Sequence, residues 1–231
     1  MTILPSLRTL AAVAVVSPLF ASSLMAQTVG IVTSNPGSLF HNIGSAIAKV
    51  ANESGLSTTI QPATSPNQYL SLVNSGEVEF GVANLQEVNY ALEGKEWFKG
   101  NANPNLRVVA LIMPLREAIF VRKDSGIKTI ADLKGKPMVD GYKAQQTILP
   151  QLEAMYATAG LTRADMQRVQ VPSVVGGAAA FMSGQAVGFI FAHGAGKVRE
   201  ADAAVGGVRR CPSRTRQRTS RRSRSTGPRA T

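Results

Sequence analysis

The sequence has 231 residues, of which 44% are hydrophobic, and a formal net charge of +11. This composition excludes a globally disordered chain. Nine Arg and no acid stand in residues 209–231, whereas residues 27–208 hold 15 basic and 14 acidic side chains, so a broad nucleic-acid surface is not indicated. The single Cys211 excludes an intramolecular disulfide, and two histidines exclude a histidine-rich metal site.

Residues 1–26 predict an export signal. A short, weakly basic start is followed by the Ala-, Val- and Leu-rich run Thr9–Leu19, then by small residues and a possible cleavage site after Ala26. The alternative is a membrane anchor, but the apolar run is short of the roughly 20 residues that span a bilayer. We therefore expect a periplasmic protein that is not stably inserted in the membrane after cleavage.

Residues 27–115 alternate between strand and helix patterns. Turn residues follow each strand run, and Ser38 and Ser65 are suitable helix caps, the second with Pro66 at the first helical position. The β-α order predicts parallel strands joined by right-handed crossovers. The predicted strands are Thr28–Val32, Ser57–Gln61 and Val78–Val82, each followed by a helix, and then the apolar run Leu106–Ile112 as a buried strand.

A second alternating unit follows over residues 116–208, with Pro114–Glu117 as the predicted hinge between two lobes. Pro150 is tolerated only near a helix start, which favours Thr147 as the cap of that helix, and the alternative is a kinked helix from near Ala144. The expected strands are Ala118–Val121, Pro137–Val139, Val169–Val171 and Val187–Phe191; the expected helices are Ile127–Leu133, Thr147–Ala159, Val175–Met182 and one that starts at Ala195–Ala201.

Four stretches carry a resemblance to a known family. They are Gly30–Ser38 with the following NIGSAIAKV, SLVNSGEVEFGVANLQEV (71–88), FVRKDSGIKTIADLKGKPM (120–138) and FMSGQAVGFIFAHGAGKVRE (181–200). The chain resembles the TAXI group of periplasmic solute-binding proteins, the receptor subunits of certain TRAP transporters. The resemblance implies an α/β fold of the type II periplasmic binding protein kind, with two lobes, mainly parallel sheets and a ligand held between the lobes. It also implies a return crossing to lobe one, which we expect to be missing here.

The resemblance implies a receptor, not an enzyme, that hands a small anionic solute to TRAP membrane subunits. We expect a monomer without a cofactor, and a carboxylate ligand such as an amino acid or a dicarboxylate. The first loop, TSNPGSLF, and the second-lobe loop, GYKAQQ, depart from the glycine-richer loops of the family, so the solute is not specified. A substrate-binding protein of an ABC-type importer is the alternative.

A bound carboxylate needs hydrogen-bond donors from loops at the carboxyl ends of strands and from helix N-termini. Arg116 could form a bidentate pair with it, and Phe40 or Tyr142 could cover its apolar part. The candidate ligand-binding residues are Thr33, Ser34, Ser38, Phe40, Thr64, Ser65, Asn84, Gln86, Arg116, Tyr142, Lys143, Gln145 and Gln146.

Simpler roles compete for several of these residues. Ser38 and Ser65 can serve only as helix caps, and Thr64 as a turn residue. Arg116 and Lys143 can be solvated surface charges.

Two other function classes are less consistent with the sequence. No Ser/His/Asp arrangement, paired-carboxylate pattern or phosphate-binding motif indicates an enzyme. The Arg-rich residues 209–231 could bind phosphates, but an export signal argues against a nucleic-acid partner. We expect 209–231 to be a disordered tail produced by a reading-frame shift, and the chain to be a damaged receptor; the alternative is a genuine basic arm.

Overall fold

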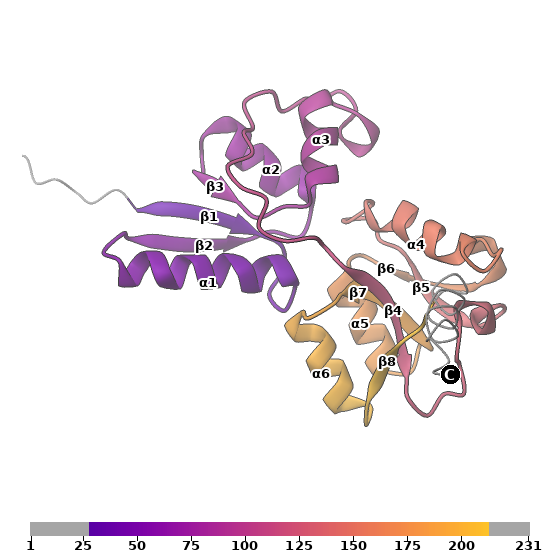
Figure 1. The fold of residues 1–231 in the computed structure, drawn as a ribbon. Helices are drawn as coiled ribbons and strands as arrows, with labels where there is room; N and C mark the ends of the chain where they lie inside the picture. Colours follow the sequence, from indigo (N-terminus) through magenta and orange to yellow (C-terminus); the bar gives the residue numbers. More distant parts are fainter. Residues whose placement is uncertain (1–27, 213–231) are drawn as a thin grey trace, which may run out of the picture.

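The computed structural model describes residues 28–212, so the predicted export signal and residues 213–231 lie outside the described residues. The described chain forms two α/β lobes, each with its own β-sheet (Figure 1). Lobe one uses strands that precede residue 82, and lobe two uses strands that follow residue 116. No helix within residues 28–212 is both long enough and apolar enough to cross a membrane.

Lobe one alternates strand and helix in the predicted order. Ser38 caps the first helix, since its hydroxyl accepts a hydrogen bond from the backbone N–H of His41, and Pro66 begins the second. Its elements are β1 (Val29–Thr33), α1 (Leu39–Glu53), β2 (Thr58–Pro62), α2 (Pro66–Ser75), β3 (Phe80–Gly81), α3 (Leu85–Glu93) and the 3-10 helix η1 (Glu96–Phe98).

The lobe-one sheet has the order β2-β1-β3, and both pairings are parallel, as the sequence predicts. Neighbouring residues of β1 face opposite sides of the sheet. Val32 therefore packs in a cluster with α2 and α3, and Ile31 packs on the other face with α1. Figure 1 shows α1 on one side of the sheet and α2 with α3 on the other.

Lobe two has a five-stranded sheet of order β6-β5-β7-β4-β8. β5 pairs in parallel with β6 and β7, whereas β4 is antiparallel to both β7 and β8, so this sheet is mixed rather than mainly parallel. The elements are β4 (Glu117–Arg122), η2 (Ile130–Leu133), β5 (Pro137–Gly141), α4 (Ile148–Ala157), η3 (Arg163–Asp165), β6 (Gln167–Val171), α5 (Val174–Met182), β7 (Gly188–Ala192), α6 (Gly196–Ala204) and β8 (Val208–Arg210).

The start of α4 confirms the interpretation of Pro150. The helix begins at Ile148 with Thr147 at the cap position, which places Pro150 third, where its missing N–H costs nothing. The kinked helix from Ala144 does not form. Leu152 and Tyr156 on this helix are fully buried in one continuous core cluster that joins the elements of lobe two.

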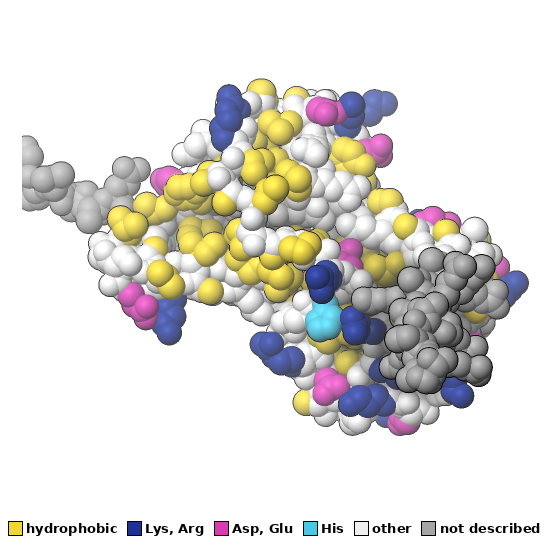
Figure 2. Space-filling view, in the orientation of Figure 1, with side chains coloured by type: hydrophobic (Ala, Val, Ile, Leu, Met, Phe, Trp, Pro, Cys, Tyr) yellow, Lys and Arg dark blue, Asp and Glu magenta, His cyan; other side chains and the backbone are white. Residues whose placement is uncertain are grey.

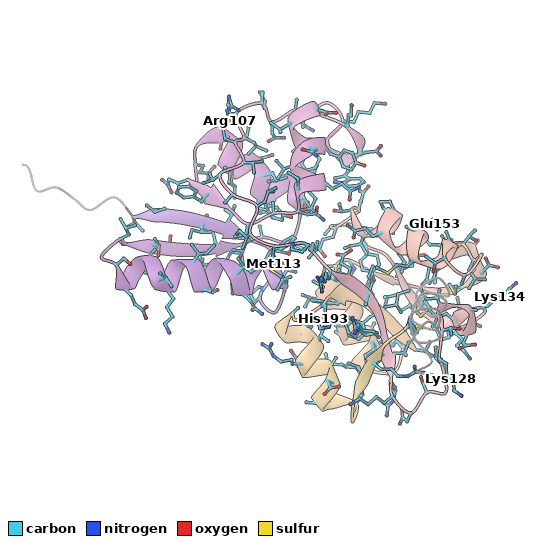
Figure 3. All side chains as sticks on the ribbon, in the orientation of Figure 1. Arg107, Met113, Lys128, Lys134, Glu153 and His193 are labelled. Carbon is cyan, nitrogen blue, oxygen red and sulfur yellow. The ribbon has the colours of Figure 1, made fainter. Side chains whose placement is uncertain are left out.

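The prediction of a buried strand at Leu106–Ile112 is wrong. Only Leu106 is buried; Val109 is 80% exposed and Leu111 is 75% exposed, and no strand of the described chain pairs with this run. Apolar character predicts a strand only where another strand supplies backbone partners. The run continues past Met113 between the lobes (Figure 3) and reaches lobe two at Glu117.

The prediction of disorder is wrong for residues 209–211, which the structure describes as part of lobe two. Arg209 and Arg210 belong to β8 and pair with β4, and the backbone N–H of Cys211 donates to the carbonyl of Ile119 at 2.8 Å. Cys211 is buried in the lobe-two core. The two arginines can pair with β4 because β8 is the edge strand of the lobe-two sheet, where charged side chains can reach solvent.

Candidate ligand-binding site

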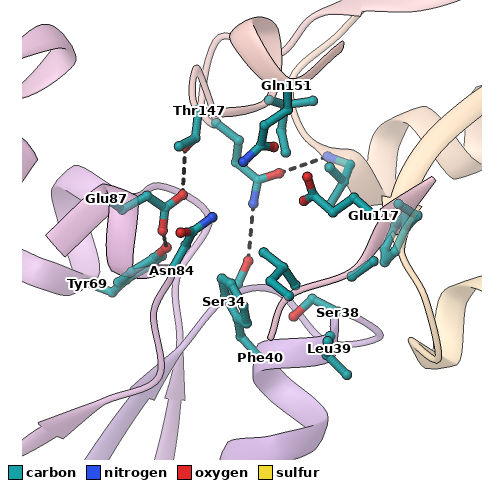
Figure 4. Close-up of a pocket in the computed structure, with 16 residues that line it drawn as sticks. Ser34, Ser38, Leu39, Phe40, Tyr69, Asn84, Glu87, Glu117, Thr147 and Gln151 are labelled. Atoms are coloured by element: carbon teal, nitrogen blue, oxygen red, sulfur yellow. Dashed lines mark hydrogen bonds between the residues drawn. The ribbon is translucent and has the colours of Figure 1, made fainter. Parts of the chain in front are cut away.

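A pocket of about 50 Å³ lies between the two lobes (Figure 4). Lobe one contributes the loop after β1, with Ser34 and Ser38, and the start of α3, with Asn84. Lobe two contributes residues around the start of α4, the first residue of α5 and the end of β7. Strand ends and helix N-termini therefore meet at the pocket, and the helix termini direct backbone N–H groups and partial positive charge toward it.

Gln145 connects the lobes across the pocket. Its Nε2 donates to Ser34 Oγ at 3.1 Å, and its Oε1 accepts from the backbone N–H of Val174 at 2.8 Å. A second link between the lobes lies at the start of α6, where the backbone N–H of Lys197 donates to the carbonyl of Gly37 at 3.1 Å. These bonds hold the lobes in contact in the observed arrangement.

Glu87, in the first turn of α3, is buried at the lobe interface. Its Oε1 accepts from the Thr147 hydroxyl of lobe two at 2.6 Å, and its Oε2 accepts from the hydroxyl of Tyr69 on α2. Burial raises the pKa of Glu87, although both hydrogen bonds act in the lowering direction. Burial, followed by the charge of Glu87, also raises the pKa of Tyr69 well above its usual value, so the phenol remains the donor.

Glu117, the first residue of β4, is a second carboxyl group in the pocket. Burial raises its pKa to about 7, with the charge of Glu87 as the smaller cause. No hydrogen bond to its carboxylate acts on it within residues 28–212, and Figure 4 draws none between it and the other pocket residues. Ordinary solution pH therefore lies close to the titration of this group.

The structure brings together five of the predicted site residues and leaves the others outside the pocket. Ser38 does both things that were proposed for it, capping α1 and lining the pocket. The five that line it are Ser34, Ser38, Phe40, Asn84 and Gln145; the eight that do not are Thr33, Thr64, Ser65, Gln86, Arg116, Tyr142, Lys143 and Gln146.

Several residues outside the pocket have clear structural roles instead. Thr33 is buried against His41 Nδ1 at 3.0 Å, and Thr64 in the loop after β2 donates to Asn35 Oδ1 in the loop after β1 at 2.9 Å. Gln86 Nε2 bonds to the hydroxyl of Tyr90, on its own helix, at 3.2 Å.

The second-lobe loop and the hinge also differ from expectation. Tyr142 is fully buried inside lobe two, with a backbone φ of 38° that few residues other than glycine adopt. Arg116, Lys143 and Gln146 are exposed, and none of the described residues that line the pocket is Lys, Arg or His.

Sequence reasoning missed Glu87, Glu117 and Gln151 as site residues. Glu87 stands three positions after the N-cap Asn84, where an acid usually stabilises a helix start. Glu117 stood within the predicted hinge, and Gln151 sits on α4 one position after Pro150. A polar side chain in the first turn of a helix is the sequence signal that points to Glu87 and Gln151.

Residues 31–208 match the NMT1-like family. The chain belongs to this family. Its fold is that of type II periplasmic binding proteins, in agreement with the sequence prediction.

The alkanesulfonate-binding protein SsuA from Xanthomonas axonopodis pv. citri, bound to MOPS, is 20% identical with a TM-score of 0.53, over 80% of this chain and 60% of that one. The periplasmic aliphatic sulphonate binding protein SsuA from Escherichia coli is 20% identical with a TM-score of 0.51, over 82% and 61%. The amino acid ABC transporter substrate-binding protein AbpA from Streptococcus pneumoniae, bound to L-arginine, is 16% identical with a TM-score of 0.51, over 80% and 74%. This chain thus spans about three fifths of the sulfonate-binding proteins.

Proposed function

We propose that the protein is a periplasmic solute-binding receptor that captures a small polar solute between its lobes and delivers it to the membrane subunits of a transporter. The observation that carries the proposal is the pocket between the lobes, lined by Ser34 and Asn84 from one lobe and by Gln145 and Glu117 from the other. Binding between two lobes couples occupancy to lobe closure, which is the signal a transporter can recognise.

An ABC-type importer is the transporter class that the comparisons favour. Among the three similar structures reported above, AbpA is described as an amino acid ABC transporter substrate-binding protein. A TRAP transporter of the TAXI group is the second candidate, and it rests on the four sequence stretches that resemble that group. Uptake measured after co-expression with either set of membrane subunits separates the two candidates.

A solute with a carboxylate fits the helix N-termini at the pocket. Ser38 at the start of α1 and Asn84 at the start of α3 line the pocket, and their side chains accept the cap hydrogen bonds through oxygen. The Ser38 hydroxyl hydrogen and the Asn84 amide can therefore donate to a carboxylate without a charged side chain. The cavity of about 50 Å³ is well below the roughly 300 Å³ of typical ligand pockets, so the lobes must separate to admit such a solute.

Calorimetry on the full chain with a panel of small carboxylates and amino acids tests this proposal. Gln145→Ala removes the bridge to Ser34 and to Val174, and should weaken binding about tenfold or more. Ser75→Ala is the matched control, because Ser75 is exposed on α2 and bonds only to its own helix. No binding across the panel, or equal binding by both variants, would contradict the proposal.

A further inference from the structure

The ionisable groups that line the pocket are all acids. Glu87 and Glu117 supply carboxyl groups and Tyr69 a phenol, and no cationic side chain of the described residues faces them there. The two carboxyl groups differ in the number of hydrogen bonds that they accept. Glu87 accepts two hydrogen bonds from Tyr69 and Thr147, whereas Glu117 accepts none in the described chain. Glu117 is therefore the acceptor left over for a ligand.

Gln151 provides an independent second acceptor at the same place. Its side-chain oxygen Oε1 is buried and has no hydrogen-bond partner among residues 28–212. Gln151 lines the pocket, and Figure 4 shows its amide directed into it above Glu117. A buried acceptor without a donor destabilises the unliganded protein, so a ligand that supplies the donor binds more tightly.

We propose that Glu117 and Gln151 form the subsite for a protonated nitrogen, so that the pocket selects solutes that carry an ammonium group over dicarboxylates. This inference rests on the proposed solute-binding function and specifies its ligand class. An ammonium group has three donors and a positive charge, which complement the Gln151 oxygen and the Glu117 carboxylate together. A dicarboxylate would instead place a negative charge beside the carboxyl groups of buried Glu87 and half-buried Glu117.

The groups around Glu117 leave it without a competing counter-ion. Glu87 on α3 and Tyr142 after β5 interact electrostatically with it, and neither side chain carries a positive charge. Its chain neighbour Arg116 is exposed, and His193 after β7 contacts that residue through the backbone only, donating its N–H to the Arg116 carbonyl at 2.7 Å. Neither basic residue lines the pocket.

Protonation of Glu117 gives the subsite a distinct pH dependence. Only the ionised carboxylate pairs with an ammonium group, and with a pKa of about 7 roughly a tenth of it is ionised at pH 6 and roughly nine tenths at pH 8. Affinity for an amine should therefore rise about tenfold between pH 6 and pH 8, and binding should release a proton near pH 7.

Matched ligand pairs test the ligand class. Calorimetry on the full chain compares alanine with lactate and 4-aminobutyrate with succinate, at pH 8, where both amines remain protonated. We expect the amine of each pair to bind at least about tenfold more tightly than its partner. Equal binding within the pairs, or tighter binding of succinate, overturns this inference and leaves the proposed function standing. No binding in either pair overturns this inference, and the proposed function fails as well only if the wider panel is also silent.

Variants then assign the preference to Glu117. Glu117→Gln keeps the shape and removes the charge, so it should weaken amine binding at least about tenfold and abolish its rise between pH 6 and pH 8. Glu77→Gln, at an exposed acid after α2 and away from the pocket, should change neither. The inference is overturned if the Glu117→Gln protein shows a cooperative thermal unfolding transition and still binds the amine as tightly as the unaltered chain.

Discussion

The two lobes begin from the same alternation of strands and helices but bury their apolar residues to very different extents. Lobe two has a five-stranded sheet and one continuous core, whereas lobe one has a three-stranded sheet with two separate, smaller clusters. Figure 2 shows hydrophobic side chains gathered over lobe one and the segment that leaves it. The strongly exposed large hydrophobic residues of the described chain are Ile47, Val50, Leu56, Phe80, Leu85, Val108, Val109, Leu111, Ile112 and Met113.

The local sequence pattern decides which element forms, whereas pairing with other elements decides whether its side chains are buried. In lobe two, β4 has a partner on each side, so Ile119 and Val121 are almost completely buried. In lobe one, the apolar run after Leu106 has no such partner in the described chain, and its side chains face solvent. Lobe two should therefore carry most of the stability of residues 28–212.

The largest expected effect is a cavity in the lobe-two core. Leu152→Ala removes a fully buried side chain and should lower the free energy of unfolding by about 2–5 kcal/mol. Val109→Ala, at an 80% exposed site, should change it by less than about 0.5 kcal/mol. Urea denaturation measures both variants, and similar losses for the two would remove the contrast between the lobes.

The interface between the lobes should make stability depend on pH. The pKa of Glu117 rises from 4.5 to about 7 in the folded protein, so the folded state binds more protons than the unfolded state between these values. The contribution of Glu117 to the free energy of unfolding should thus be greatest below about pH 4.5. It should fall, by up to about 3 kcal/mol, as the pH rises from there through 7.

Denaturation at a series of pH values, with Glu117→Gln beside the unaltered protein, checks this expectation. The variant should lose most of the slope and be more stable at pH 8. A residual slope of the same sign belongs to Glu87, whose pKa is also raised. A slope of opposite sign, or one unaffected by the variant, would show that the pKa of Glu117 is not raised in the folded protein.

The sequence predicted most strands and helices, and part of the site. Pro150 located the start of α4, and Ser38 located α1, because each obeys a rule set by its neighbours in the chain. Ser34 and Gln145 were found because loops after parallel strands meet at one sheet edge. The run after Leu106 was misassigned because hydrophobicity records a tendency to be buried, not the presence of a partner.

The acids of the pocket could not be found by the same reasoning. Glu87 has the local appearance of a helix-start acid, and its bond to Thr147 joins residues sixty positions apart in different lobes. Whether Glu117 is buried depends on how closely the lobes approach. Such features follow from tertiary contact and are absent from any short stretch of sequence.

The contact of Gly44 on α1 with β1 tests how tightly lobe one is packed. Gly44 on α1 packs so closely against β1 that an added Cβ would lie 2.4 Å from Thr33 Cγ2. Gly44→Ala should lower the free energy of unfolding by about 1–3 kcal/mol, despite a helix-propensity gain of about 1 kcal/mol. Ser45→Ala on the same helix is the control and should be neutral within about 0.5 kcal/mol. A stabilised Gly44→Ala protein would mean that lobe one is too loosely packed to resist the extra methyl.

Substitutions in the exposed apolar run after Leu106 should have the smallest effect on stability and a clear effect on self-association. Val109 and Leu111 both lie more than two thirds exposed, so Val109→Lys with Leu111→Lys should alter the free energy of unfolding by less than about 0.5 kcal/mol. The same change interrupts the contiguous apolar surface, which should lower binding of a hydrophobic dye and reduce self-association measured by light scattering. Lys128→Ala and Lys134→Ala, which remove exposed charges from lobe two, serve as the comparison and should leave dye binding unchanged. A marked loss of stability in the double lysine variant would instead mean that the run is buried in solution, and that lobe one resembles lobe two more closely than its described contacts indicate.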